Sequence, residues 1–204
     1  MGRNLIPLLL RRGHFVRALV RRGSDAKVPP GCEIVNGDAL DASSYAAKIA
    51  PADTFVHLVG VAHPNPSKAE EFRNIDGKSI EEAVRAAKQA GVQHFVYVSV
   101  AHPAPMMKAY IKVRSRGEEL IRASGMKATF VRPWYVLGPG RRWPVVLIPM
   151  YWMMGMIPAT RESAQRLGLV TLEQMMGALC RAVENPAEGI RIVEVPEIRR
   201  SAIK

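Results

Sequence analysis

Apolar segments typical of buried strands alternate with helical segments along most of this chain. In the helical segments the apolar residues recur at a spacing of three and four, as at Ile80, Ala83, Val84 and Ala87. The predicted strands cover 15–20, 32–38, 54–60, 94–99 and 127–133, and the predicted helices between them cover 41–50, 70–90 and 109–124. Strands that alternate with helices form a parallel sheet with helices on both faces. The order therefore predicts an α/β fold with a doubly wound parallel sheet.

The last third of the chain has a different composition. Residues 138–160 are rich in proline, methionine and tryptophan, and the stretch 144–159 carries no charge and is flanked by arginines. This composition predicts a small apolar C-terminal cap. Residues 1–137 then form the α/β core, and residues 138–204 pack on it as a substrate or cap region within one compact unit.

The formal net charge of +11 is compatible with an anionic cofactor, nucleic acid or an anionic membrane. We expect no nucleic acid, because the basic residues are spread over many elements, without a helix-turn-helix or an RNA-binding aromatic stripe. We expect no metal, because Cys32 and Cys180 are far apart and the five histidines show no HxxxH or HExxH spacing. The same isolated cysteines favour the cytoplasm over an oxidising compartment. No uncharged apolar run reaches the roughly 20 residues of a membrane-spanning helix.

The first 22 residues contain six arginines and no acidic residue. Such a segment is compatible with a targeting peptide or a basic amphipathic membrane helix. Gly13, however, separates a segment of helical spacing from the predicted strand at 15–20. We therefore favour a helix followed by a buried strand, which is typical of the second half of a βαβ unit.

The order of several segments resembles the short-chain dehydrogenase/reductase superfamily, in its extended or atypical NAD(P)H-binding branch. That branch includes NAD-dependent epimerase/dehydratase-like and NmrA-like proteins and the NAD(P)H-binding accessory subunit of respiratory complex I. The segments that carry the resemblance are FVRALVRRGS, VNGDALD, TFVHLVG, FRNIDGKSIEEAVRAAKQAGVQHFVYVSV, KATFVRPWYVLGPG and RLGLVTLEQMMGAL. They follow the family order over nearly the whole chain. The resemblance implies a Rossmann-like fold in which residues 1–137 bind a dinucleotide.

The start of the sequence departs from the family pattern. The family opens with a strand and a GxxGxxG turn, whereas here only Gly2 matches, as the last glycine of that turn. In the strand order 3-2-1-4-5-6 the first strand is central. Its loss leaves a gap of about 9 to 10 Å or brings the flanking strands together. Because the rest of the pattern is intact, we expect a truncated start in preference to a damaged family member.

Arg21 and Arg22 end the strand that holds the adenosine ribose in the family. An acid there favours NAD, whereas arginine pairs with the 2′-phosphate of NADP. NADP is therefore the expected cofactor, with NAD and a merely solvated basic turn as alternatives. The other cofactor-binding positions that the resemblance implies are Gly2, Asp38 at the adenine, Gly60 after a buried strand, Asn74 on the long helix, and Arg132 and Pro133 near the nicotinamide. Taken alone, Asp38 is also an ordinary turn residue and Asn74 an ordinary helix-surface residue.

The superfamily pattern for catalysis is a serine that ends a strand and a Tyr-x-x-x-Lys pair on the next helix. There the tyrosine transfers a proton, while the lysine binds the nicotinamide ribose and assists the tyrosine through its charge. Ser99 and Tyr110 match this pattern, and Arg114 stands in place of the lysine. A spacing of four residues puts Tyr110 and Arg114 on one helix face. Because arginine and lysine are not interchangeable, a surface tyrosine beside a solvated arginine stays an alternative.

Two functions of different classes follow from the resemblance. The first is an NAD(P)-dependent oxidoreductase or epimerase-like enzyme that acts on an apolar carbonyl or quinone-like compound. The second is a non-catalytic NAD(P)H-binding regulator, or an accessory or assembly factor of a membrane complex, which Arg114 favours. The apolar stretch 144–159 suits a small apolar substrate. It suits equally a peripheral contact with a membrane surface, a packed cap or the face of a homodimer.

Overall fold

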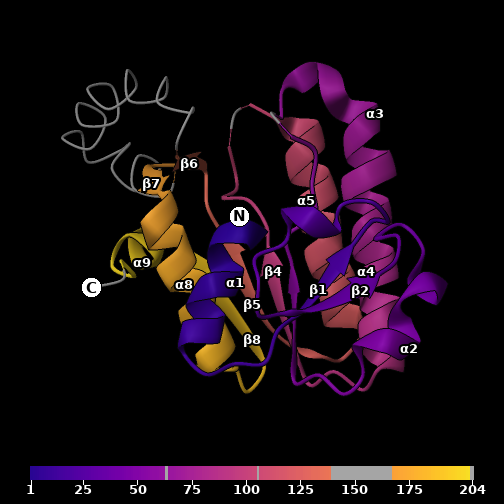
Figure 1. The fold of residues 1–204 in the computed structure, drawn as a ribbon. Coiled ribbons are helices and arrows are strands. Elements are labelled where there is room, and N and C mark those ends of the chain that lie inside the picture. Colours follow the sequence, from indigo (N-terminus) through magenta and orange to yellow (C-terminus); the bar gives the residue numbers. More distant parts are fainter. Residues whose placement is uncertain (63, 105, 139–166, 203–204) are drawn as a thin grey trace.

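The computed structural model of the chain describes residues 1–62, 64–104, 106–138 and 167–202 (Figure 1). Its main sheet is parallel, and its strands in order are β3 (Thr54–His57), β4 (His94–Val98), β5 (Lys127–Arg132) and β8 (Ile190–Glu194). Two further parallel pairs are β1 (Arg17–Val20) with β2 (Glu33–Asn36), and β6 (Tyr135–Leu137) with β7 (Leu169–Thr171). The α/β architecture with parallel strands, predicted from the alternation of elements, is confirmed.

The parallel sheet is divided between β1 and β3. Among the described residues, β1 pairs with β2 and β3 pairs with β4, and no strand pairs with the other edge of either. The division falls at the place of the central strand in the order 3-2-1-4-5-6. The sequence predicted either a gap at this place or a direct approach of the flanking strands. In the structure the flanking strands β1 and β3 do not pair.

Helices cover both faces of the main sheet. On one face lie α1 (Gly2–Arg11), α8 (Leu172–Glu184) and α9 (Val195–Arg199), and on the other lie α4 (Lys78–Gln89) and α5 (Lys108–Ala123) (Figure 1). Alternate side chains of β4 divide between the two cores. Val96 and Val98 pack with α1 and α8, whereas Phe95 and Tyr97 pack with α4 and α5. All of β4 is buried, as expected for a strand with helices on both sides.

The helix predicted at 70–90 consists of three parts. The short α3 (Ala69–Glu71) leads into a π-helix, η4 (Phe72–Gly77), and α4 follows. A π-helical turn holds more residues than an α-helical turn and often occurs at functional sites. Here the side chains of Phe72 and Asp76 both enter the interior with no exposed surface. Apolar periodicity did not predict this turn, because Asp76 is a polar member of the buried face.

Shorter helices connect the remaining strands. They are η1 (Asp25–Lys27), η2 (Ala42–Ser44), α2 (Ala46–Ile49) and η3 (Pro66–Lys68). The helix predicted at 41–50 is present as η2 and α2. Its predicted cap is confirmed, because the Asp41 carboxylate accepts a hydrogen bond of 3.0 Å from the backbone N–H of Ser43.

The C-terminal part of the chain contributes to the main sheet. β8 pairs with β5 in parallel register, from Ala128 opposite Ile190 to Arg132 opposite Glu194. The predicted apolar stretch 144–159 lies outside the described residues, so the substrate, membrane and homodimer contacts assigned to it stay predictions. The boundary after residue 137 also stays a prediction. Within the residues that the structure describes, no helix is both long and apolar enough to cross a bilayer.

Candidate functional site

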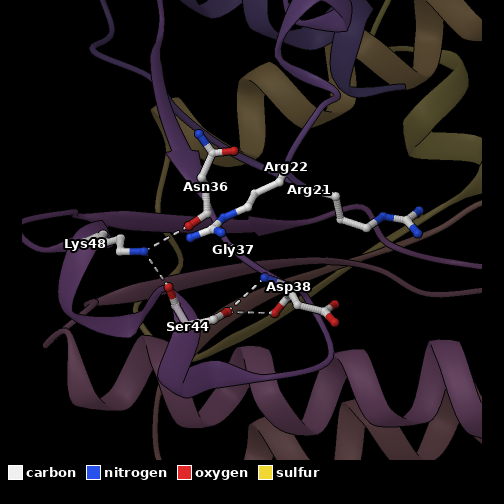
Figure 2. A pocket seen from close by; sticks show the side chains of 7 residues that line it. All are labelled: Arg21, Arg22, Asn36, Gly37, Asp38, Ser44 and Lys48. Carbon is white, nitrogen blue, oxygen red and sulfur yellow. Dashed lines mark hydrogen bonds between the residues drawn. The ribbon is translucent and has the colours of Figure 1, made fainter.

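A polar pocket lies where β1 and β2 end. Its cavity of about 430 Å³ is lined by Arg21, Arg22, Asn36, Gly37, Asp38, Ser44 and Lys48 (Figure 2). Arg21 and Arg22 follow β1 directly, and Asp38 lies two residues after β2. Ligands of doubly wound folds bind outside the carboxyl ends of the strands. The structure thus brings together three of the residues that the resemblance assigns to cofactor binding.

Hydrogen bonds fix the loop that carries Asp38. The hydroxyl of Ser44 accepts from the backbone N–H of Asp38 at 2.8 Å and donates to the carbonyl oxygen of Asp41 at 2.7 Å. Lys48 donates to the carbonyl oxygens of Asn36 at 3.0 Å and Ser44 at 2.8 Å (Figure 2). Lys48 therefore connects β2 with η2 and brings a third cation to the pocket. Sequence reasoning missed Lys48, because nothing in the pattern separates it from other lysines of short helices.

Gly37 allows the loop to close on η2. A Cβ atom at Gly37 would lie 2.9 Å from the Cβ of Tyr45 and 3.0 Å from the Cδ1 of Leu19. A side chain there would push the loop away from the pocket. Burial, with nearby carboxylates, raises the pKa of Tyr45 to about 12. The phenol behind the loop therefore stays neutral and adds no charge to the site.

The charges of the pocket suit a phosphate group. Its lining carries two guanidinium groups and one ammonium group against one carboxylate, that of Asp38. A phosphate monoester carries about 1.5 to 2 negative charges at neutral pH, and arginine binds its oxygens in pairs. Figure 2 shows the side chain of Arg22 reaching across the pocket toward Lys48, while Arg21 extends in the opposite direction. The donor set therefore fits the phosphate of a phosphorylated ribose.

A second cluster lies at the carboxyl ends of β3 and β4, where Arg114 of α5 is only 4% exposed. Its Nη1 donates to the carbonyl oxygen of Val98 at 3.0 Å and its Nη2 to that of Val59 at 3.3 Å. Nη2 also forms an ion pair with Asp76 Oδ1 at 2.5 Å. Burial lowers the pKa of Arg114, but the nearby Tyr110, Tyr97 and Asp76 outweigh it and raise that pKa, so the guanidinium stays charged.

Asp76 of the π-helix η4 binds two segments with its two carboxylate oxygens. Oδ1 accepts from Arg114, and Oδ2 accepts from the backbone N–H of Val61 at 2.9 Å. Burial raises the pKa of Asp76, while Arg114 and the Val61 N–H act in the opposite direction. Sequence reasoning missed Asp76, although a signal existed: it lies four residues before Ile80, on the apolar stripe of the helix. The predicted Asn74, two residues earlier, is exposed.

Gly60 lies against this ion pair. A Cβ atom at Gly60 would overlap the Nη2 of Arg114 and lie 3.0 Å from Asp76 Oδ1. The absence of a side chain at residue 60 therefore admits the guanidinium of Arg114. The resemblance assigns Gly60 to the cofactor, and that role stays a prediction.

Tyr110 stacks on the same guanidinium. The Cζ of Arg114 lies 5.2 Å from the centre of the Tyr110 ring, within the range of a cation–π contact. The ring of Phe72 packs against the ring of Tyr110 with centroids 5.0 Å apart. The four-residue spacing on α5 therefore brings Tyr110 and Arg114 together. Their catalytic roles stay predictions.

Ser99 and Arg132 meet a third buried group, Glu118 of α5. Arg132 donates to both carboxylate oxygens, from Nε at 2.8 Å and from Nη2 at 2.5 Å. Burial raises the pKa of Glu118, but the hydrogen bonds from Arg132, the nearby hydroxyl of Ser99 and the charges of Arg132 and His102 lower it overall. Glu118 was also missed, although it lies four residues after Arg114 on the same face of the helix.

The two remaining predicted positions are Pro133, which is buried directly after β5, and Gly2, which is half-buried at the start of the chain. The carbonyl oxygen of Pro133 accepts from the backbone N–H of Ala101 at 2.9 Å, which joins the segments that follow β4 and β5. Gly2 begins α1, and a Cβ atom there would lie 3.9 Å from Leu58, the residue after β3. In the described ranges no three His, Cys, Asp or Glu side chains gather as metal ligands.

Comparison with known proteins identifies the family. The model of a family described as NAD(P)H-binding matches residues 1–143. A ceramide reductase of Caulobacter vibrioides is 26% identical over 206 residues, which cover 98% of this chain and 62% of the reductase. A 3 beta-hydroxysteroid dehydrogenase/Delta 5-->4-isomerase of Mycobacterium tuberculosis is 36% identical over 107 residues, 48% of this chain and 28% of that enzyme. This chain thus spans less than two thirds of the length of either relative.

A solved structure supports the fold. A short-chain dehydrogenase/reductase superfamily protein from Agrobacterium tumefaciens with bound NAD superposes on this chain with a TM-score of 0.67 at 18% identity. The match covers 94% of this chain and 73% of that protein. At this identity the likeness concerns the fold alone. The family match over residues 1–143 and the Rossmann-like architecture agree, and the chain belongs to the NAD(P)H-binding family.

Proposed function

We propose that the protein is an NADPH-dependent oxidoreductase that reduces the carbonyl group of an apolar substrate. The observation that carries the cofactor choice is the pocket after β1 and β2, whose lining includes Arg21, Arg22 and Lys48. The 2′-phosphate of NADP would bind there, with Arg22 as its main partner and Asp38 toward the adenine. NAD lacks this phosphate and would offer the guanidinium groups of Arg21 and Arg22 no phosphate at that position.

The names of the two curated relatives support an apolar substrate. One is called a ceramide reductase and the other a hydroxysteroid dehydrogenase/isomerase. Both names describe lipid-like compounds. We infer for this chain a carbonyl group within an apolar framework, which includes ketones and quinone-like compounds.

Two residues of the chain would act on the substrate. The bound nicotinamide would supply the hydride that reduces the carbonyl carbon. Tyr110 would give its hydroxyl proton to the carbonyl oxygen, and Ser99 would orient that oxygen by a hydrogen bond. The cation below the ring of Tyr110, Arg114 at 5.2 Å, would stabilise the phenolate that remains after the transfer.

The test combines cofactor binding with turnover. The full chain is titrated with NADPH and NADH by the fluorescence of the bound dihydronicotinamide, and NADPH oxidation is then followed against a panel of apolar ketones and quinones. We expect Tyr110→Phe to keep NADPH binding and to lower kcat by about 100-fold or more, because general acid catalysis contributes about that much. Lys112→Gln, an exposed residue two positions further on α5, is the matched control. Equal turnover of Tyr110→Phe and the unmodified protein would remove Tyr110 as the proton donor.

The alternative is a non-catalytic NAD(P)H-binding regulator or accessory factor. Arg114 favours it, because the guanidinium at the place of the family lysine is already engaged by Asp76 and two backbone carbonyls. Tight NADPH binding without turnover of any compound in the panel would support this alternative over the enzyme.

A further inference from the structure

The buried guanidinium of Arg114 bonds to groups of the protein itself. Its two terminal nitrogens bond to three segments: the end of β4 at Val98, the residue Val59 after β3, and Asp76 of η4. Release of Arg114 toward a ligand would leave the fully buried Asp76 without its cation. An unpaired buried charge of this kind is strongly unfavourable. The guanidinium is therefore committed to the protein.

The contact of Arg114 with Tyr110 is made through the ring and leaves the hydroxyl of Tyr110 to other partners. The guanidinium carbon lies 5.2 Å from the centre of the Tyr110 ring and 5.7 Å from that of the Tyr97 ring. Tyr97 comes from the centre of β4, whereas Tyr110 lies in the first turns of α5. Arg114 thus links the position of Tyr110 on the helix to the buried sheet.

We propose that Arg114 is a positioning residue, held by Asp76, that fixes Tyr110 at the carboxyl ends of β3 and β4. It does not bind the cofactor ribose. Gly60 is part of the same arrangement, because the absence of a side chain there makes room for the guanidinium of Arg114. The arginine at the place of the family lysine then has a different task from that lysine. This inference rests on the proposed function only for the chemistry that Tyr110 performs.

The test removes both charges together. Asp76→Asn/Arg114→Met replaces the buried ion pair by two neutral groups of similar size, which avoids an uncompensated charge. Arg114→Lys keeps one charge but offers a compact ammonium instead of the planar fork. The control is Arg17→Lys at the start of β1. Arg17 also has a carboxylate partner, Glu33 at 2.8 Å, and an aromatic ring, Phe15 at 5.3 Å.

NADPH affinity separates the positioning role from a ribose-binding role. If Arg114 is a positioning residue, the double variant binds NADPH within about threefold of the unmodified protein, and its kcat falls by about tenfold or more at little changed KM. Arg114→Lys then shows an intermediate kcat, and Arg17→Lys shows none of these changes. A rise of about tenfold or more in the Kd for NADPH would instead assign Arg114 to the cofactor and overturn the proposal. An unchanged kcat in the double variant would overturn it as well.

A measurement without turnover keeps this test separate from that of the proposed function. The NMR signals of the Tyr110 ring, assigned with Tyr110→Phe, report its position whether or not a substrate is known. We expect them to shift and broaden in the double variant and to stay in place in Arg17→Lys. Unchanged Tyr110 signals in a folded double variant would overturn the positioning role, even if the protein reduces no ketone.

Discussion

Arg132, the last residue of β5, donates to both carboxylate oxygens of Glu118 in α5, at 2.8 and 2.5 Å. The Glu118 side chain is 1% exposed and that of Arg132 is 10% exposed. This ion pair holds α5, the helix that carries Tyr110, against the carboxyl end of β5, close to Ser99. Together with Arg114 and Asp76, it gives this part of the molecule two buried ion pairs on one helix.

Removal of the Glu118 charge should destabilise the fold strongly. Glu118→Gln deprives the buried guanidinium of Arg132 of its two close bonds to a carboxylate, while the longer ion pair with Glu194 at 3.8 Å remains, and we expect a loss of about 3–5 kcal/mol in the free energy of unfolding. Urea denaturation measures this loss. Glu119→Gln, one residue further, removes an ion pair with Arg116 whose side chains are 61% and 66% exposed. It should cost less than about 1 kcal/mol. Equal losses for the two variants would contradict the structural role of Glu118.

Gly60→Ala should disturb the Arg114–Asp76 pair. The added methyl group overlaps the guanidinium, which cannot move away without losing its bonds to Asp76 and two carbonyl groups. We expect a loss of about 1–3 kcal/mol in the free energy of unfolding. Gly189→Ala is the control, because no atom lies within 4 Å of a Cβ atom there. A stability of Gly60→Ala equal to that of Gly189→Ala would show that the overlap is relieved at no cost.

Arg21→Gln/Arg22→Gln should reduce the preference for NADPH over NADH. Loss of the charge-assisted hydrogen bonds of both arginines to a phosphate, at about 1.5–3 kcal/mol each, lowers the affinity for NADPH by about 100-fold or more. The affinity for NADH should change little. The Kd values of both cofactors, measured by fluorescence titration, give the result. Lys88→Gln/Arg116→Gln removes two charges from exposed helix positions as a control for net charge. A parallel loss of both affinities would contradict the 2′-phosphate site.

His57 should make the fold less stable in acid. The side chain is 3% exposed and packs beside Tyr97 at a ring separation of 5.5 Å. Burial, with the Arg114 charge as the second cause, lowers the pKa of His57 from 6.5 to about 3. Between these values the unfolded chain binds a proton that the native state does not bind. Stability from this group is therefore present above pH 6.5 and is lost as the pH falls, by at most about 1.4 kcal/mol per pH unit.

The measurement compares His57→Phe with the unmodified protein in urea unfolding between pH 7 and pH 4, a range set by the two pKa values. The free energy of unfolding of the variant should fall less steeply toward acid. His14→Gln is the control, because the His14 side chain is 33% exposed. Parallel curves for His57→Phe and the unmodified protein would show that the histidine titrates normally in the native state.

The sequence predicted the elements and their order because the signals for them are local. The apolar run of β4, the spacing of three and four residues in α4 and the cap at Asp41 each depend on residues fewer than five positions apart. The pairing of Tyr110 with Arg114 was predictable for the same reason, because both lie on one face of α5. The resemblance added the cofactor class, which the family match over residues 1–143 confirms.

Tertiary structure decided which of these residues share a site and what each contacts. Asp76 and Arg114 are 38 residues apart, and Glu118 and Arg132 are 14 apart, so no helical or strand period relates them. They meet because the ends of β3, β4 and β5 lie side by side and because a π-helical turn directs a carboxylate inward. The sequence by itself determined a doubly wound α/β chain with candidate side chains at the strand ends. Only the packing of α5 and η4 on the sheet determined that Arg114 is buried, since burial depends on contacts between segments distant in the chain.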